Sequence, residues 1–338
     1  MIHELLNTLI EGKDLTADEA EDFLDAVIAG EATPAQIGAI LTALRIKGEA
    51  TSEIVGLLHG MRSHMLSIEA PGAIDIVGTG GDGSGTFNIS TAAAIVAAGA
   101  GAKVAKHGNR AASSKCGSAD VLEALGVNIQ LSPEQSKKVF DTAGIVFLLA
   151  PVYHAALKNV IAVRKELKVR TIFNVLGPFA NPARAKRQLI GVPNEKIAKC
   201  MASVASKLGY ERVIIVTSKD GLDEISLSTK TTCYDVGNSI KKISIDPKKL
   251  GLKKADVSEL QGGTADDNAG IIRAVLEGAQ GPQRDVVVLN AAFGLYVAGI
   301  VKDPKEGIVL AQKSIDSGAA KAALARLVKE SNIFKAAV

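Results

Sequence analysis

Tryptophan is absent from this chain of 338 residues, and other aromatic residues are few, with eight phenylalanines and four tyrosines. Proteins that bind single-stranded nucleic acid without sequence preference stack the bases on aromatic side chains. The net charge of +3 is also too small to indicate a nucleic-acid or membrane partner. We therefore expect an aliphatic core and no nucleic-acid partner, and any anion-binding site has to be local.

Cysteine is almost as scarce, since only Cys116, Cys200 and Cys233 occur. They are odd in number, widely spaced and not arranged as CxxC, which argues against a disulfide framework and a cysteine zinc site. The chain begins with Met-Ile-His-Glu and lacks a basic segment followed by an uninterrupted apolar one. These absences predict a cytoplasmic protein without a targeting segment or a membrane span.

What the chain does contain is 47% hydrophobic and 22% charged residues, which is typical of globular proteins. Near the start, Thr16 with Glu19 and Thr33 with Gln36 have the spacing of helix capping boxes, and Pro34 suits a first helical position. Apolar residues recur there at helical spacing, which predicts short amphipathic helices packed into a small helical domain. These apolar residues are Leu5, Leu6, Leu9, Ile10, Phe23, Leu24, Val27, Ile28, Ile37, Ile40, Leu41 and Leu44.

From residue 73 onward, short apolar runs alternate with helical patterns. Such alternation predicts an α/β fold with a mainly parallel sheet flanked by helices, next to the smaller all-helical domain. The segment 152–187 turns helical and basic, so we expect the chain to return there to the helical domain. We place the small domain at 1–68 plus 151–186 and the large one at 69–150 plus 187–338. The predicted strands are 74–77, 104–105, 145–149, 189–192, 213–217 and 286–289.

A glycine-rich run between a predicted strand and a predicted helix is the strongest functional signal. Residues 77–91 read Val-Gly-Thr-Gly-Gly-Asp-Gly-Ser-Gly-Thr-Phe-Asn-Ile-Ser-Thr. Glycines let successive N–H groups turn toward one anion, and Ser90 and Thr91 begin a helix whose free N–H groups favour phosphate. A flexible glycine turn is the plainer interpretation, but the strand–loop–helix context favours a phosphate site. The run is neither a Walker A motif nor a dinucleotide fingerprint.

Two more polar runs follow predicted strands. Residues 106–114 read Lys-His-Gly-Asn-Arg-Ala-Ala-Ser-Ser, and residues 221–226 read Gly-Leu-Asp-Glu-Ile-Ser. Ligands of parallel α/β sheets bind beyond the carboxyl ends of the strands, so we expect the first run to face the glycine-rich loop. Asp223 and Glu224 offer the hard oxygen ligands that Mg²⁺ takes beside phosphates. Taken singly, such side chains are more often solvated loop residues.

Together these runs resemble the anthranilate phosphoribosyltransferase family. The resemblance continues through residues 117–126, 170–183 and 290–292, and it spans nearly the whole chain. It implies transfer of the phosphoribosyl group from phosphoribosyl pyrophosphate to the amine of anthranilate, in tryptophan biosynthesis, with two Mg²⁺ ions. It also implies a homodimer and a small helical domain hinged on the α/β domain, with the reaction in the cleft between them.

The resemblance also implies roles for individual residues. Ser90, Asp223 and Glu224 would place the Mg²⁺ ions, and Arg164 would pair with the anthranilate carboxylate. Arg170 and the other cations near Arg164 are interpreted as solvated. No catalytic residue is assigned, because charge neutralisation and positioning suffice for the step. The residues implied to bind substrate are Gly78, Gly81, Asp82, Thr86, Asn88, Ile89, Ser90, Thr91, Lys106, His107, Gly108, Asn109, Arg110, Ser113, Ser114, Ser118, His154, Arg164 and Pro178.

The sequence departs from the family pattern at two points, and two rival interpretations stay open. His154 is followed by Ala155 where a proline is common, and Cys116 stands where a serine is frequent. The first rival is a pyrimidine nucleoside phosphorylase, which would bind inorganic phosphate in its glycine-rich loop and need no Mg²⁺ pair. The second is a non-catalytic relative that binds nucleic acid through the lysines between positions 241 and 254.

Overall fold

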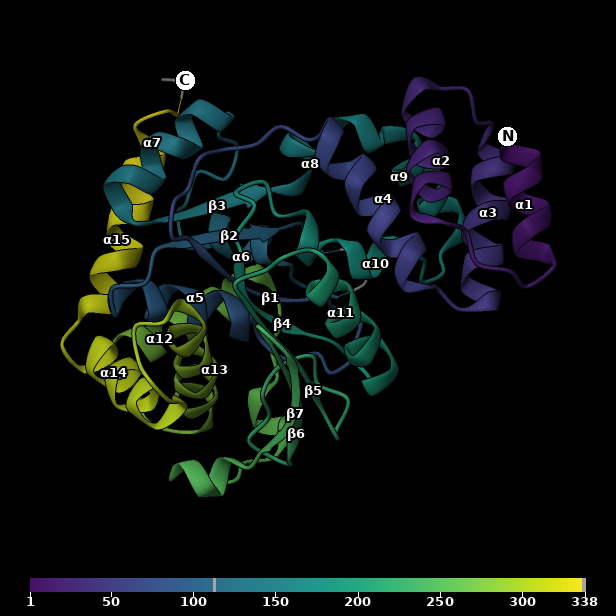
Figure 1. The fold of residues 1–338 in the computed structure, drawn as a ribbon. Helices are drawn as coiled ribbons and strands as arrows, with labels where there is room; N and C mark the ends of the chain where they lie inside the picture. The colour runs from purple at the N-terminus through teal and green to yellow at the C-terminus, as the bar shows by residue number, and fades with distance from the viewer. Residues whose placement is uncertain (112–113, 336–338) are drawn as a thin grey trace.

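The computed structural model describes residues 1–111 and 114–335, and one seven-stranded sheet forms its centre (Figure 1). The strands are β1 (Ile74–Gly78), β2 (Val104–Gly108), β3 (Ile145–Leu149), β4 (Arg187–Gly191), β5 (Arg212–Ser218), β6 (Thr231–Val236) and β7 (Ile240–Ile245). Their order across the sheet is β3-β2-β1-β4-β5-β6-β7. The first five pair in parallel, and β6 and β7 are antiparallel. The predicted mainly parallel sheet flanked by helices is confirmed.

The N-terminal helices begin where the sequence predicts. They are α1 (Ile2–Ile10), α2 (Ala17–Ala29), α3 (Pro34–Lys47) and α4 (Thr51–His64). Thr16 and Thr33 form complete capping boxes, so each satisfies an N–H group that the helix itself leaves unpaired. Most of the predicted apolar face is buried, but the prediction is wrong for Ile10, whose side chain is 69% exposed.

The chain returns to these helices after β3. The segment contains α8 (Ala150–Tyr153), η1 (Ala155–Leu157), α9 (Lys158–Leu167), α10 (Phe173–Leu176) and η2 (Pro178–Ala180). Helix α9 packs against α2 and α3, and its Val160 and Val163 belong to the same hydrophobic core as those helices (Figure 1). The expected return therefore occurs, while the exact domain boundaries stay a prediction.

The other helices cover the sheet. They are α5 (Ile89–Gly99), α6 (Ser118–Ala124), α7 (Pro133–Ala143), α11 (Glu195–Lys207), α12 (Ala265–Leu276), α13 (Pro282–Ala298), α14 (Pro304–Asp316) and α15 (Ala319–Asn332). Alternate residues of β5 enter different cores: Ile214 packs in the core that contains α5 and α13, whereas Val213 and Ile215 pack with α11 and the N-terminal helices. One central strand thus joins the two parts of the molecule.

Three strand assignments need correction. Residues 286–289 form part of α13, and all four are buried. A continuous apolar run does not distinguish a buried strand from a helix that is covered all round. Strands β6 and β7 were not predicted, and β7 carries Lys241 and Lys242 on an exposed edge. Within the described part of the chain, no helix combines the length and the apolar character that crossing a bilayer requires.

The strand order places a crevice at the carboxyl end of β1. The chain moves from β1 outward to β2 and β3 and then returns to β4 on the other side of β1. Connections leave the neighbouring strands β1 and β4 in opposite directions, and ligands of such sheets bind at this switch point. The glycine-rich loop follows β1 directly, so the topology positions it there.

Candidate functional site

The glycine-rich loop connects β1 to α5 and turns through several left-handed residues. Gly80 and Gly81 have φ angles of 71° and 75°, which a residue with a Cβ atom rarely adopts. The Gly80 N–H donates a hydrogen bond of 2.6 Å to Asp223 Oδ2. Ile89, at the end of the loop, has a buried side chain, so only its backbone is available to a ligand.

Asp223 and Glu224 follow β5 and lie buried against the switch point. A Cβ atom on Gly78 would lie 2.6 Å from Asp223 Oδ2, and one on Gly191 would lie 1.6 Å from the Asp223 carbonyl oxygen. Gly78 therefore makes room for this carboxyl group, a role that differs from the predicted phosphate contact. Asn290 of α13 fixes the next residue, because it accepts from the N–H of Ile225 and donates to its carbonyl, both at 3.0 Å.

The start of α5 joins these acids to a buried cation. The Ser90 N–H donates to Glu224 Oε1 at 3.1 Å, so this N–H meets a carboxyl group where the sequence predicted a phosphate. Lys106 Nζ donates to Ile76 O at 2.7 Å and to Ser90 Oγ at 3.4 Å. Thr91 Oγ1 is buried and has no hydrogen-bond partner among the described residues. Ser90 thus contacts both Lys106 and Glu224.

Burial and like charge dominate the electrostatics here. Burial, and next the nearby Asp82, raise the pKa of Asp223 to about 7. Burial and then Asp223 raise the pKa of Glu224 well above its usual value. Burial lowers the pKa of Lys106, against the pull of Asp75 and the two acids. Ionising this group of carboxyls is costly unless a further cation joins them.

The acids do not form a complete metal site by themselves. Among residues 1–111 and 114–335, no group of three His, Cys, Asp or Glu side chains is arranged to hold a metal ion. A cation at Asp223 and Glu224 would therefore take further oxygens from Ser90, water or a phosphorylated ligand. This combination is typical of Mg²⁺, which keeps several waters and binds through one or two carboxylates plus phosphates.

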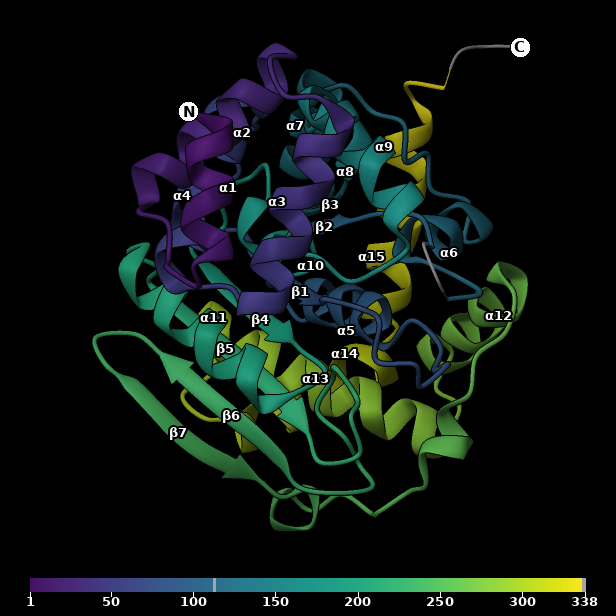
Figure 2. The same cartoon turned by 90° about the vertical axis from the view of Figure 1, so that its right-hand side faces the viewer.

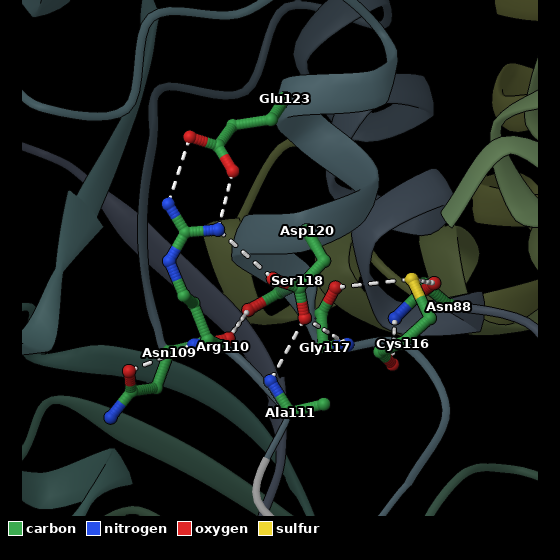
Figure 3. A network of polar contacts seen from close by, with 9 residues as sticks. All are labelled: Asn88, Asn109, Arg110, Ala111, Cys116, Gly117, Ser118, Asp120 and Glu123. Carbon is green, nitrogen blue, oxygen red and sulfur yellow. Dashed lines mark hydrogen bonds and ion pairs between the residues drawn. The ribbon is translucent and has the colours of Figure 1, made fainter. Parts of the chain in front are cut away.

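Figure 3 shows the second polar loop, which follows β2, and the Asp120 carboxylate that links its two ends. Asp120 Oδ2 accepts from the N–H groups of Ala111 and Gly117, each at 2.9 Å. Arg110 pairs with Asp120 and, through both terminal nitrogens, with Glu123. The pKa of Arg110 is raised by these two acids. The Arg110 guanidinium is therefore engaged with α6 in this structure.

Close packing and hydrogen bonds hold the other predicted residues of this region. Strand β2 extends through Gly108. The first three residues of the run 106–114 therefore belong to the strand, whereas the sequence predicted that the run follows it. A Cβ atom on Gly108 would lie 2.2 Å from Ser118 Oγ, which donates to Asn109 O at 3.3 Å. Ser114 Oγ donates to the carbonyl of Cys116 at 3.5 Å. Ser113 lies outside the described residues.

The far half of the glycine-rich loop meets the second loop. Asn88 Nδ2 donates to Cys116 O at 3.2 Å, and the Cys116 thiol donates to Asn88 Oδ1 at 3.4 Å (Figure 3). Asp82 Oδ2 accepts from the Asp223 N–H at 3.5 Å. Thr86 pairs as an isolated bridge with Gln261. The structure thus brings the three polar runs together, as the sequence predicts.

Two buried imidazoles lie beside this cluster. The rings of His107 and His154 are 5.3 Å apart between centroids, and His107 Nδ1 lies 3.1 Å from Gly177 O. Burial lowers the pKa of His107 to about 3 and that of His154 to about 4, so both rings are neutral at pH 7. Pro178, which follows Gly177, is also buried. The two rings are tilted by 55° to each other and form a neutral aromatic pair at the end of β2.

Arg164 of α9 is a partly buried cation. Its Nη2 donates to Asn174 Oδ1 at 3.2 Å, and its guanidinium carbon lies 5.6 Å from the centroid of the Phe173 ring. Within the described residues no carboxylate forms an ion pair with it, and burial lowers its pKa. Arg170, interpreted from the sequence as solvated, is half-buried, and the structure corrects that interpretation. A guanidinium left without a carboxylate is ready for an anionic ligand.

Comparisons with known proteins agree over the whole chain. Residues 70–321 match the glycosyl transferase family a/b domain, and residues 3–65 match the helical bundle domain of the same family. The chain is 51% identical to the anthranilate phosphoribosyltransferase of Thermomicrobium roseum, over 98% of this chain and 97% of that protein. It is 48% identical to the one of Acetivibrio thermocellus, over 99% and 98%.

Solved structures give the same result. The anthranilate phosphoribosyltransferase of Thermus thermophilus has a TM-score of 0.91 at 40% identity, over 97% of this chain and 99% of that one. The enzyme of Saccharomyces cerevisiae, in complex with PRPP and Mg, has a TM-score of 0.91 at 29% identity, over 98% of both chains. Because sequence and structure agree across both the helical and the α/β parts, the chain belongs to the anthranilate phosphoribosyltransferase family.

Proposed function

We propose that this protein transfers the phosphoribosyl group from phosphoribosyl pyrophosphate to the amine of anthranilate, as a cytoplasmic enzyme of tryptophan biosynthesis. One observation carries the proposal: the glycine-rich loop, the buried Asp223 and Glu224, and Lys106 all meet at the carboxyl ends of the central strands. The yeast relative is in complex with PRPP and Mg in one structure and with 4-fluoroanthranilate in another. Those ligands support the same two substrates here.

Two magnesium ions suit the donor set beside the loop. Asp223 and Glu224 are crowded with Asp82 and carry raised pKa values, so a divalent cation would remove their mutual repulsion. Together with Ser90 they would hold the ions between β5 and the start of α5. When bound, Mg²⁺ supplies neutralisation of the charge that grows on the departing diphosphate.

The chain's own donors assist departure of the diphosphate. Lys106 Nζ donates to Ser90 Oγ, and the Ser90 and Gly80 N–H groups lie against Glu224 and Asp223, so these donors lie beside the proposed diphosphate site. The bond between ribose C1 and the diphosphate oxygen breaks, its electron pair leaves with the diphosphate, and C1 gains oxocarbenium character. Preorganised donors stabilise this separation of charge because they need no reorientation.

The acceptor would lie between the imidazole pair and Arg164. The Arg164 guanidinium matches a carboxylate in two hydrogen bonds, and the neutral His107 and His154 rings offer a surface for an aromatic ring. The amine nitrogen then attacks C1, and the resulting ammonium group releases one proton to water after the bond forms. A histidine whose pKa is 3 or 4 is too weak a base to remove that proton first, so no general base is assigned.

The activity is tested by mixing protein, both substrates and Mg²⁺ and following the loss of anthranilate fluorescence. We expect the loss to require all four components and to stop when EDTA is added. A parallel reaction with a pyrimidine nucleoside and inorganic phosphate, without Mg²⁺, tests the phosphorylase alternative. Turnover only in that second reaction would contradict the proposal.

We further propose a homodimer formed through the small helical domain, taken as residues 1–68 plus 151–186 beside a large domain of 69–150 plus 187–338. Ile10, Ile46 and Ile161 are 69%, 82% and 38% exposed, and they lie on α1, α3 and α9, of which α3 packs against both α1 and α9. We take these exposed apolar side chains as the centre of the proposed interface, because apolar surface left exposed on a monomer is a common site of association.

Substitution Ile46→Glu is expected to convert the dimer to a monomer, because it buries a charge in the proposed interface. Size-exclusion chromatography with light scattering at micromolar concentration measures the mass directly. The matched control is Val309→Glu, since Val309 is 66% exposed on α14, away from this face. A wild type that runs as a monomer, or a control that dissociates equally, would contradict this interface.

A further inference from the structure

A late segment of the chain runs along the far half of the glycine-rich loop. We call residues 260–268 the strap. The Phe87 N–H donates to Leu260 O at 3.0 Å, and the Gly262 N–H donates to Gly85 O at 2.9 Å, around the bridge between Thr86 and Gln261. Gln261 Nε2 adds a hydrogen bond of 2.9 Å to Ser84 O. The strap therefore pairs with the loop like a short antiparallel strand.

Asn268 links the end of the strap to the loop. It lies in α12, which packs against α6 (Figure 2), and its side chain is 2% exposed. Its Nδ2 donates to Asn88 Oδ1 at 2.9 Å, and its Oδ1 accepts from the Gly263 N–H at 2.8 Å. A Cβ atom on Gly262 would lie 2.6 Å from Asn268 Oδ1, so the strap is glycine where this side chain passes.

The partner of Asn268 occupies a junction. Asn88 bonds Cys116 of the second loop through both ends of its amide, and it directly precedes Ile89, the first residue of α5. Fixing Asn88 therefore fixes the approach to Ser90, which contacts both Lys106 and Glu224. A loop with several left-handed glycines loses much conformational entropy on ordering, and contacts made before the ligand arrives reduce that loss.

We propose that Asn268 is a positioning residue for the phosphoribosyl diphosphate, acting through Asn88, and this proposal rests on the proposed function. In this proposal Asn268 acts through Asn88 and does not itself touch the substrate. Asn268 holds the glycine-rich loop in its binding geometry, although it lies 180 residues after Asn88 in the chain. Its loss thus affects affinity for the diphosphate substrate and spares the acceptor.

The test is Asn268→Asp, which keeps an acceptor for the Gly263 N–H but places an oxygen against Asn88 Oδ1. We expect the Kd for phosphoribosyl pyrophosphate with Mg²⁺, measured by calorimetry without acceptor, to rise about tenfold or more. The KM for that substrate rises equally, while the KM for anthranilate stays within about threefold. Asn268→Ala removes both contacts without adding a buried charge, and we expect the same selective loss.

The matched control is Asn128→Asp. Asn128 Nδ2 donates to Ser331 O at 3.2 Å, and Asn128 Oδ1 accepts from the Gln130 N–H at 3.2 Å. Asn128→Asp therefore also places a carboxylate oxygen against an acceptor oxygen, but far from the glycine-rich loop. A lower melting temperature with unchanged diphosphate affinity in both Asn268 variants, or equal losses for both substrates, would overturn the proposal. If wild type binds the diphosphate but never consumes anthranilate, only the proposed reaction fails. If it does not bind, both fail.

Discussion

Replacing Asp223 with Asn and Glu224 with Gln is expected to lower kcat about a thousandfold, the scale of several kcal/mol that a metal ion contributes to charge stabilisation. The amide side chains retain acceptors for the N–H groups of Gly80 and Ser90, so the loop keeps its hydrogen bonds. What disappears is the negative charge that would bind Mg²⁺. The measurement is kcat at pH 8 over a Mg²⁺ titration.

The same variant is expected to melt at a higher temperature than wild type at pH 8 without Mg²⁺. Burial raises the pKa of Asp223 from 3.8 to about 7, and Glu224 shifts in the same direction. Stability from such groups is complete below the ordinary pKa and is lost as the pH rises through the folded value. Amides cannot ionise and so avoid the loss, which is on the order of a few kcal/mol at pH 8 and near zero at pH 4.

Calorimetric melting at pH 4, 5 and 8 separates these expectations. The control variant, Asp18→Asn with Glu31→Gln, removes two exposed carboxylates and should show neither effect. Unchanged activity at limiting Mg²⁺ would contradict the metal role of the pair. A lower melting temperature at pH 8 would show instead that the ionised carboxylates stabilise the fold. The expected trade of stability for activity is common where acids are buried for function.

The parts of the fold that sequence predicts best are those set by local chemistry. The capping boxes at Thr16 and Thr33 and the first five strands depend on neighbouring residues and short periods, and the structure has them. The run 286–289 fails because α13 is surrounded on every side, which erases helical periodicity. Strands β6 and β7 are separated by three residues that include Gly237 and Asn238, a hairpin signal that could have revealed them.

For the site, too, sequence predicts what depends on local chemistry and misses what depends on tertiary packing. The carboxyl-end rule for parallel strands correctly predicts that Lys106 and Asp223 approach the glycine-rich loop. It does not predict that Gly78 serves to admit Asp223, because that depends on the packing of β5 beside β1 and β4. Nor does it reveal Asn268 or Asn290, which act from helices whose place against the loop is fixed by the whole core. Contacts of this kind join residues that are distant in the sequence, so no local sequence pattern reveals them.

Replacing Arg164 with Ala is expected to raise the KM for anthranilate about 50-fold, the worth of a charge-assisted bidentate hydrogen bond, and to leave the KM for phosphoribosyl pyrophosphate nearly unchanged. Arg164 has no carboxylate partner among the described residues, so its guanidinium is available to the acceptor. Initial rates measured by anthranilate fluorescence, with each substrate varied in turn, give both constants.

Two comparisons make the Arg164 result specific. Aniline lacks the carboxylate, so wild type and Arg164→Ala should use it equally poorly if the guanidinium recognises that group. Arg170→Ala removes a second half-buried guanidinium, whose pKa is lowered by burial and next by Arg45, against the opposite effects of Glu49 and Asp223. Acidic side chains already act on Arg170, whereas burial alone shifts the pKa of Arg164, so we expect Arg170→Ala to affect anthranilate less than Arg164→Ala does. Equal losses for both substrates in Arg164→Ala, or a larger anthranilate effect from Arg170→Ala, would assign the carboxylate to a different residue.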